Sequence, residues 1–109
     1  MGIWGLDIYD DDLAMDIKKE FEDYLEQGMD ENEALEEIIL NNDNLLEEIE
    51  ESGTFILVLG VLSKENEVSN HKVYKLLKEL KNNKEYWNYI RDNSNDLYEA
   101  RMDLLREFV

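Results

Sequence analysis

Aspartates cluster near the start of the chain, and their side chains are the ones whose spacing most suggests chemistry. They are Asp7, Asp10, Asp11, Asp12 and Asp16. Carboxylate oxygens are the ligands that Mg²⁺ and Ca²⁺ prefer, so the cluster is a candidate cation site. An EF-hand loop, however, needs glycine at its sixth position and glutamate at its twelfth. Counted from Asp7, these positions hold Asp12 and Lys18. Helix capping or a solvated face is therefore the simpler interpretation.

A row of acids continues at helical spacing. Asp12, Asp16, Glu20 and Asp23 recur every three or four residues, which places them on one side of a helix. Paired carboxylates perform acid–base chemistry when one of them is desolvated, but nothing in the surrounding sequence indicates a pocket. We therefore expect this row to be solvated.

Other reactive side chains are scarce. The chain has no cysteine, which excludes disulfides, zinc thiolate sites and thiol nucleophiles. His71, its one histidine, has polar neighbours at a predicted helix start, and the sequence places no nucleophile beside it. We predict a surface histidine, no catalytic residues, no metal and no cofactor. Trp4 and Trp87 are expected to anchor the core, although an exposed tryptophan would mark a binding hot spot.

The charge of the chain is unevenly distributed. The net charge is −17; Met1–Thr54 holds 19 acids and two bases, whereas Phe55–Val109 holds nine of each. Such a surface repels nucleic acid, which binds through Lys and Arg. It attracts basic partner proteins and accelerates encounter with them. Solubility alone is the alternative explanation for this charge.

The spacing of apolar residues predicts an all-α fold, a compact bundle of about five or six short antiparallel helices in one acidic domain over residues 1–109. The first helix is expected to start within Asp10–Asp12 and to end at Gly28. The second starts at Asp30 with a capping box and breaks at Asn41–Asn44. The apolar pattern resumes over Leu45–Glu51.

The middle of the chain contains its longest apolar run. Ser52-Gly53-Thr54 is predicted to be a turn, in which Ser52 or Thr54 caps the next helix. Phe55–Leu62 suits a buried strand or a buried helix, and its helical neighbours favour a central helix. This run is far shorter than the roughly 20 residues of a membrane span, and the start of the chain does not resemble a signal peptide. We therefore expect a cytoplasmic protein that does not bind membranes.

The remaining segments are predicted from their polar interruptions. Lys64–Ser69 is a polar link, and Ser69 or Asn70 caps a helix that exposes four lysines. Turns at Asn82-Asn83 and Asn93–Asn95 separate a short aromatic helix from the last helix. Residues 1–11 are expected to form an ordered, irregular segment, with a short strand through Leu6 and Ile8 as the alternative.

The opening of the chain resembles a known family. The pattern is Met1-Gly2-x-Trp4-Gly5-x-x-Ile8-Tyr9-Asp10-x-Asp12-x-Ala14-x-Asp16. It is similar to the start of the bacterial family known as domain of unknown function 4259, and Gly53-x-Phe55 resembles a later part of that family's pattern. The chain departs from the family where members often have proline before the apolar helix and more aromatic residues within it. The resemblance implies a small bacterial protein and transfers no catalytic residue.

These features predict a small binding module that docks on a basic partner protein and neutralises it. Immunity proteins, antitoxins and defence or anti-defence proteins act in this way, and nucleic-acid mimicry is a special case. The predicted contact residues are the acids outside the apolar stripes of the first two helices: Asp16, Glu20, Asp23, Glu33, Glu36 and Glu37. The alternative is a metal-dependent hydrolase that uses the aspartates between Asp7 and Asp16.

Overall fold

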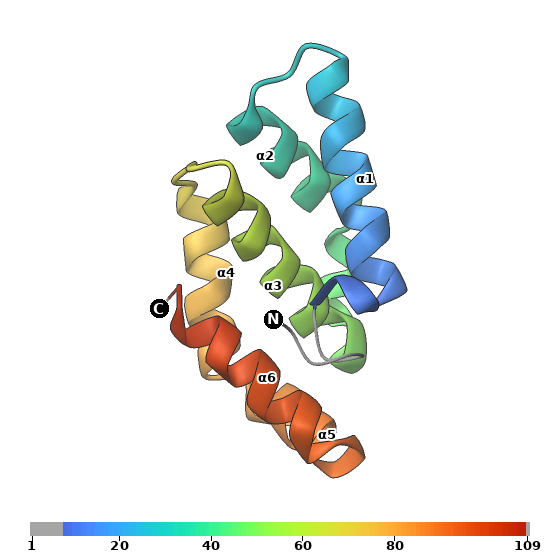
Figure 1. The fold of residues 1–109 in the computed structure, drawn as a ribbon, viewed down its shortest axis with the longest axis vertical. Helices are drawn as coiled ribbons and strands as arrows, with labels where there is room; N and C mark the ends of the chain where they lie inside the picture. Colours follow the sequence, from blue (N-terminus) through green and yellow to red (C-terminus); the bar gives the residue numbers. More distant parts are fainter. Residues whose placement is uncertain (1–7, 109) are drawn as a thin grey trace.

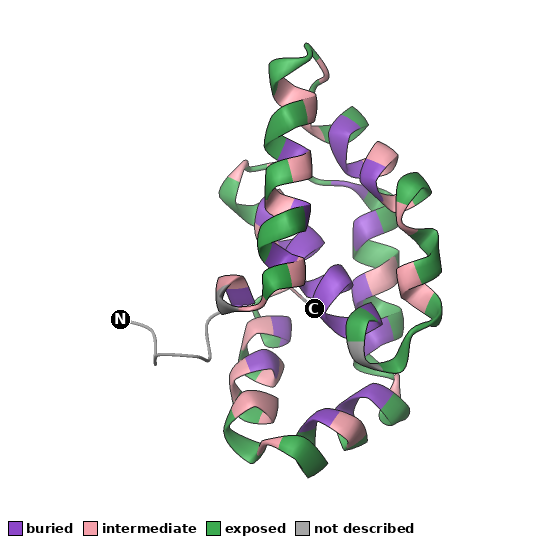
Figure 2. Ribbon diagram, turned by 90° about the vertical axis from the view of Figure 1, so that its right-hand side faces the viewer, coloured by how far each residue is buried: buried purple, intermediate pink, exposed green. Residues whose placement is uncertain are grey.

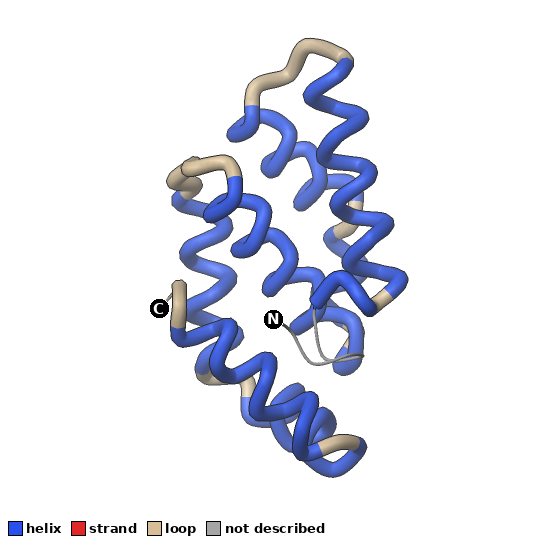
Figure 3. The backbone as a smooth tube through the Cα atoms, viewed as in Figure 1, coloured by secondary structure: helices blue, strands red, loops and turns tan. Residues whose placement is uncertain are grey.

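The structure is a computed structural model, and it describes residues 8–108 of the 109-residue chain (Figure 1). Its elements in this range are η1 (Ile8–Asp10), α1 (Asp12–Glu26), α2 (Glu31–Asn41), η2 (Asp43–Glu47), α3 (Ile49–Glu65), α4 (His71–Lys81), α5 (Lys84–Asn93) and α6 (Asn95–Arg106), where η denotes a 3-10 helix. The predicted all-α class is confirmed, because the described residues contain helices and no strand (Figure 3). Ile8 lies in η1 and not in the alternative strand, whereas Trp4 and Leu6 lie outside the described residues.

Local side-chain chemistry determines the bounds of the α1–α2 hairpin. The Asp11 carboxylate accepts a hydrogen bond from the Leu13 backbone amide at 2.9 Å and so caps α1. Gly28 has a φ of 101°, a left-handed conformation that glycine adopts without strain, and it reverses the chain. Asp30 and Glu33 form the predicted capping box at the start of α2. The sequence prediction for this hairpin is confirmed.

The central helix α3 is longer than its apolar run, which corrects the predicted turn at Ser52-Gly53-Thr54. α3 begins at Ile49, with Glu48 as a cap residue that makes no side-chain capping bond. Gly53 is required for packing, because a Cβ atom there would lie 2.1 Å from Cζ of Tyr86. The predicted caps were also wrong, since Ser52 and Thr54 are buried inside the helix. The pattern over Leu45–Glu51 is divided between η2 and α3.

α3 lies in the middle of the molecule and contacts α1, α4, α5 and α6, whereas α2 packs mainly on α1 (Figure 1). The predicted helix over Phe55–Leu62 is confirmed, and the apolar residues from Phe55 to Leu59 are at most 6% exposed. Buried positions of the outer helices face the interior (Figure 2). Trp87 of α5 is a core anchor as predicted, and its indole nitrogen donates to the Leu80 carbonyl at 2.8 Å. Among the described residues, none of the helices combines the length and apolarity needed to cross a membrane.

Candidate functional site

The predicted contact residues of α1 differ in exposure. Asp16 and Asp23 are exposed, whereas Glu20 is half-buried. These positions share one side of α1, and the buried residues Ala14 and Ile17 lie on another. α1 therefore presents a carboxylate row to solvent along much of its length, as its spacing predicts.

A polar network joins Glu20 to the end of α2. The Tyr24 hydroxyl donates to the Glu20 carboxylate at 3.1 Å and accepts a hydrogen bond from Asn41 Nδ2 at 2.7 Å. Asn42 Nδ2 donates to the same carboxylate at 3.2 Å and to the Ile38 carbonyl at 2.9 Å. The network fixes the two helices against each other and holds Glu20 in place.

The pKa of the Tyr24 hydroxyl is raised in this network. Desolvation by burial raises its pKa, and so do the hydrogen bond to Glu20 and the negative charges of Glu20 and Glu37. The hydrogen bond from Asn41 acts in the opposite direction. Glu37 lies four residues before Asn41, so it shares the side of α2 from which Asn41 reaches Tyr24.

The remaining predicted residues of α2 divide into two sets. Glu33 is exposed, and its side chain completes the capping box. Glu36, in contrast, faces α4: its carboxylate accepts from Lys72 Nζ and from Asn70 Nδ2, both at 3.3 Å. Asp16, Asp23 and Glu33 are therefore exposed, Glu20 and Glu37 are half-buried, and Glu36 belongs to the contact between α2 and α4.

Leu40 is an exposed residue of α2 that the sequence prediction missed. Its side chain is 68% exposed, although leucine is usually buried. Leu40 lies three residues after Glu37 and four after Glu36, so it stands between the side of α2 near Tyr24 and the side that contacts α4. A leucine among acids, outside the apolar stripe of its helix, is a signal that the sequence does contain. We call Asp16, Glu20, Asp23, Glu33, Glu37 and Leu40 the hairpin surface.

Few ion pairs in the described part of the chain involve acids of the α1–α2 hairpin. Within residues 8–108, the ion pairs that involve acids of the α1–α2 hairpin are Asp11 with Arg101 and Glu36 with Lys72. Of the two lysines of α1, Lys18 lies over the Tyr9 ring, with its Nζ 4.7 Å from the ring centroid. Asp16, Asp23, Glu33 and Glu37 form no ion pair within the described residues, although exposed Lys19 stands three residues after Asp16 and four before Asp23. The acids outnumber the bases on the hairpin, so its surface attracts basic groups.

The N-terminal aspartates do not assemble a metal site in the part of the chain that is described. Asp7 lies outside this part, Asp12 and Asp16 are exposed, and Asp11 is used as the cap of α1 and the partner of Arg101. In residues 8–108, no three His, Cys, Asp or Glu side chains are grouped so that they could hold a metal ion. His71 is exposed at the start of α4, as expected.

Comparison with known proteins finds no match. No family model, curated protein or solved structure matches the chain. The resemblance to domain of unknown function 4259 therefore stays a prediction. Function must be inferred from the surface itself.

Proposed function

We propose that the protein is a binding module whose hairpin surface docks on a basic patch of a partner protein. The observation that carries this proposal is Leu40, which is 68% exposed and lies three residues after Glu37, an acid that forms no ion pair within the described residues. Stable protein interfaces combine an apolar centre, which supplies affinity, with a polar rim. Leu40 would serve as the centre, and the acids around it as the rim.

The acids would act mainly on the rate of encounter. Complementary charge steers association, so a field of unpaired carboxylates favours rapid capture of a basic partner. The network of Tyr24, Asn41 and Asn42 holds the two helices in register before binding, which lowers the entropic cost of docking. A preformed acidic surface of this kind suits a protein that neutralises a basic protein, as immunity proteins and antitoxins do.

Charge reversal tests the proposal once a partner has been captured from the source cells. The test variant carries Asp16→Lys, Asp23→Lys and Glu37→Lys, which leave the capping box at Glu33 intact. The matched control carries Glu67→Lys, Asp92→Lys and Glu99→Lys, a change of the same net charge on exposed positions outside the hairpin. We expect association of the test variant to be at least tenfold slower at low salt, and the control to stay within about twofold of the wild-type rate.

A second variant separates affinity from steering. Leu40→Ala removes the apolar centre without a change in charge, so we expect faster dissociation with an unchanged association rate. Equal slowing by both charge-reversal variants would show that net charge alone acts, and the hairpin surface would then be no contact site.

A further inference from the structure

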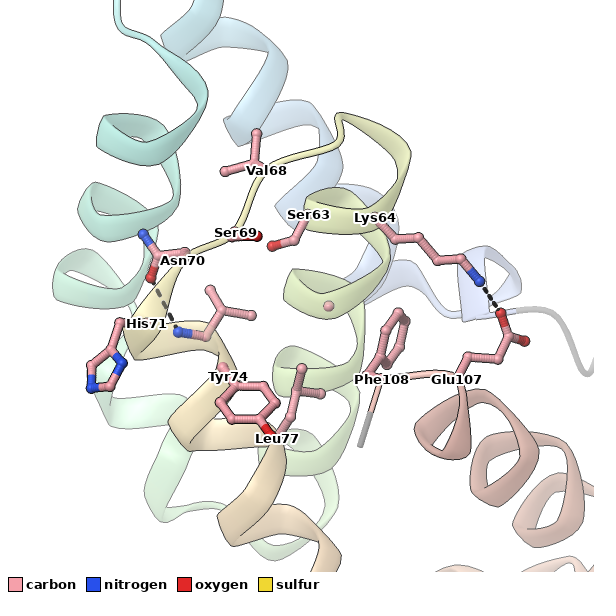
Figure 4. Close-up of a pocket in the computed structure, with 12 residues that line it drawn as sticks. Ser63, Lys64, Val68, Ser69, Asn70, His71, Tyr74, Leu77, Glu107 and Phe108 are labelled. Atoms are coloured by element: carbon pink, nitrogen blue, oxygen red, sulfur yellow. Dashed lines mark hydrogen bonds and ion pairs between the residues drawn. The ribbon is translucent and has the colours of Figure 1, made fainter.

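A groove lies between α3 and α4, away from the residues of the hairpin surface. Its volume is about 580 Å³. Gly60, Val73 and Leu77 contribute its apolar lining, Phe108 forms one side, and Tyr74 lies on the other side (Figure 4). A groove of this size accommodates one or two large side chains of a bound ligand.

The end of the described chain forms one wall of the groove. The Phe108 ring packs so closely on α3 that a Cβ atom at Gly60 would lie 3.1 Å from it. Glu107 forms an ion pair with Lys64 at the edge of the groove, and Lys64 Nζ lies 6.0 Å from the centroid of the Phe108 ring. This wall therefore presents an aromatic ring beside an ion pair whose charges neutralise each other.

A second hollow continues from the groove along the surface of α4. This hollow of about 330 Å³ shares His71 and Tyr74 with the first and continues past Lys75 and Lys78. Tyr74 is 48% exposed, and Lys78 Nζ lies 5.3 Å from the centroid of its ring. α4 contains four lysines and one glutamate, so it is cationic in a chain whose net charge is −17. The exposed part of the groove thus combines an aromatic side chain with positive charge.

We propose that this groove binds a short acidic peptide segment of a partner protein, with an aromatic side chain next to its carboxylates. The aromatic ring would pack between Tyr74 and Leu77, beside Phe108, and the carboxylates would meet Lys75 and Lys78. The shape favours a peptide, because two adjoining hollows follow the axis of α4. The charge favours an acidic segment, because the second hollow is lined by Lys75 and Lys78 and by one acid, Glu79. This site is separate from the hairpin surface, for which we propose a basic partner instead of an acidic one.

Selection from a library of random dodecapeptides displayed on phage tests the proposal with the full chain as bait. We expect enrichment of peptides that contain Trp, Phe or Tyr flanked by Asp or Glu. The affinity of one enriched peptide, labelled with fluorescein, is then measured by fluorescence anisotropy. Tyr74→Ala should weaken binding about tenfold. Lys75→Glu with Lys78→Glu should weaken it further at low salt, and both variants change exposed positions, so the fold should persist.

Leu40→Ala is the control, since it alters the hairpin surface and should leave the affinity for the peptide unchanged. Failure to enrich acidic aromatic peptides, or equal affinity of Tyr74→Ala and wild type, would overturn the proposal. A wild-type dimer in sedimentation that Phe108→Ala converts to monomer would also overturn it, because a second copy of the chain would then fill the groove.

Discussion

Arg101 is a buried cation that joins the last helix to three other parts of the molecule. Its Nη1 donates to the Tyr86 hydroxyl at 2.8 Å and to the Thr54 hydroxyl, and its Nη2 lies 3.4 Å from the Asp11 carboxylate. Its Nε has no hydrogen-bond partner in the described part of the chain. Because the guanidinium is buried, the stability of the fold depends on the groups that it contacts.

Removal of Arg101 should destabilise the fold. Arg101→Ala leaves the Tyr86 and Thr54 hydroxyls without their donor and opens a cavity, so we expect a loss of about 3 kcal/mol in the free energy of unfolding. Arg106→Ala is the matched control: Arg106 has an exposed side chain in the same helix, and its loss should cost less than about 0.5 kcal/mol. Urea denaturation measures both values. Similar stability of the two variants would contradict the role assigned to Arg101.

Tyr24 should make stability depend on alkaline pH. Its pKa in the folded state is raised, so its contribution is complete below the unfolded value of about 10 and is lost as the pH rises through the folded pKa. We therefore expect the free energy of unfolding to fall more steeply above pH 10 in the wild type than in Tyr24→Phe. Lysine titration is common to both proteins and cancels in the difference. Parallel pH curves would show that the hydroxyl is not desolvated.

At the scale of single elements, α3 shows where local patterns mislead. Ser-Gly-Thr is typical of a turn. In α3, however, Gly53 leaves room for the Tyr86 ring, and the Thr54 hydroxyl accepts a hydrogen bond from Arg101. The partners lie 33 and 47 positions from Gly53 and Thr54, so sequence spacing gave no indication of them. The α1–α2 hairpin was predictable because its caps, Asp11 and the Asp30–Glu33 pair, act within three residues.

Gly53→Ala tests this interpretation of α3. Alanine favours a helix over glycine by about 1 kcal/mol, which would stabilise α3 if the side chain had room. The Tyr86 ring leaves none, so we expect a net loss of about 2 kcal/mol in urea denaturation. Gly28→Ala provides a comparison, since it meets no neighbour and loses stability only through its positive φ, by about 1 kcal/mol. A Gly53→Ala variant more stable than wild type would contradict the close contact with Tyr86.

At the scale of the whole molecule, the charges are segregated among helices. Acids dominate α1 and α2, whereas α4 is cationic. This asymmetry and the helical class could be predicted from the sequence, because both depend on composition and spacing. The ion pair between Glu36 and Lys72 and the groove at Gly60 could not be predicted, because each depends on how α2 and α3 pack against α4.

Salt should stabilise the molecule. Unpaired carboxylates on α1 and α2 repel one another, and mobile ions screen that repulsion. We expect sodium chloride to raise stability by about 1 kcal/mol between 10 and 300 mM, which corresponds to roughly 4–8 °C in Tm for a chain of this size. The variant with Asp16, Asp23 and Glu37 changed to Lys should gain less from salt. A Tm that does not respond to salt would show that the acids are too dispersed to repel.

Zero-length carbodiimide cross-linking of the captured complex tests the central claim most directly. The reagent joins a carboxylate to a lysine only where the two are in contact, so mass spectrometry of the products maps the interface. We predict links from partner lysines to Asp16, Asp23, Glu33 and half-buried Glu37, with few links from the exposed Asp92, Asp96 and Glu99. Links concentrated on α5 and α6, or spread evenly over all exposed acids, would contradict the assignment of the hairpin surface as the binding site.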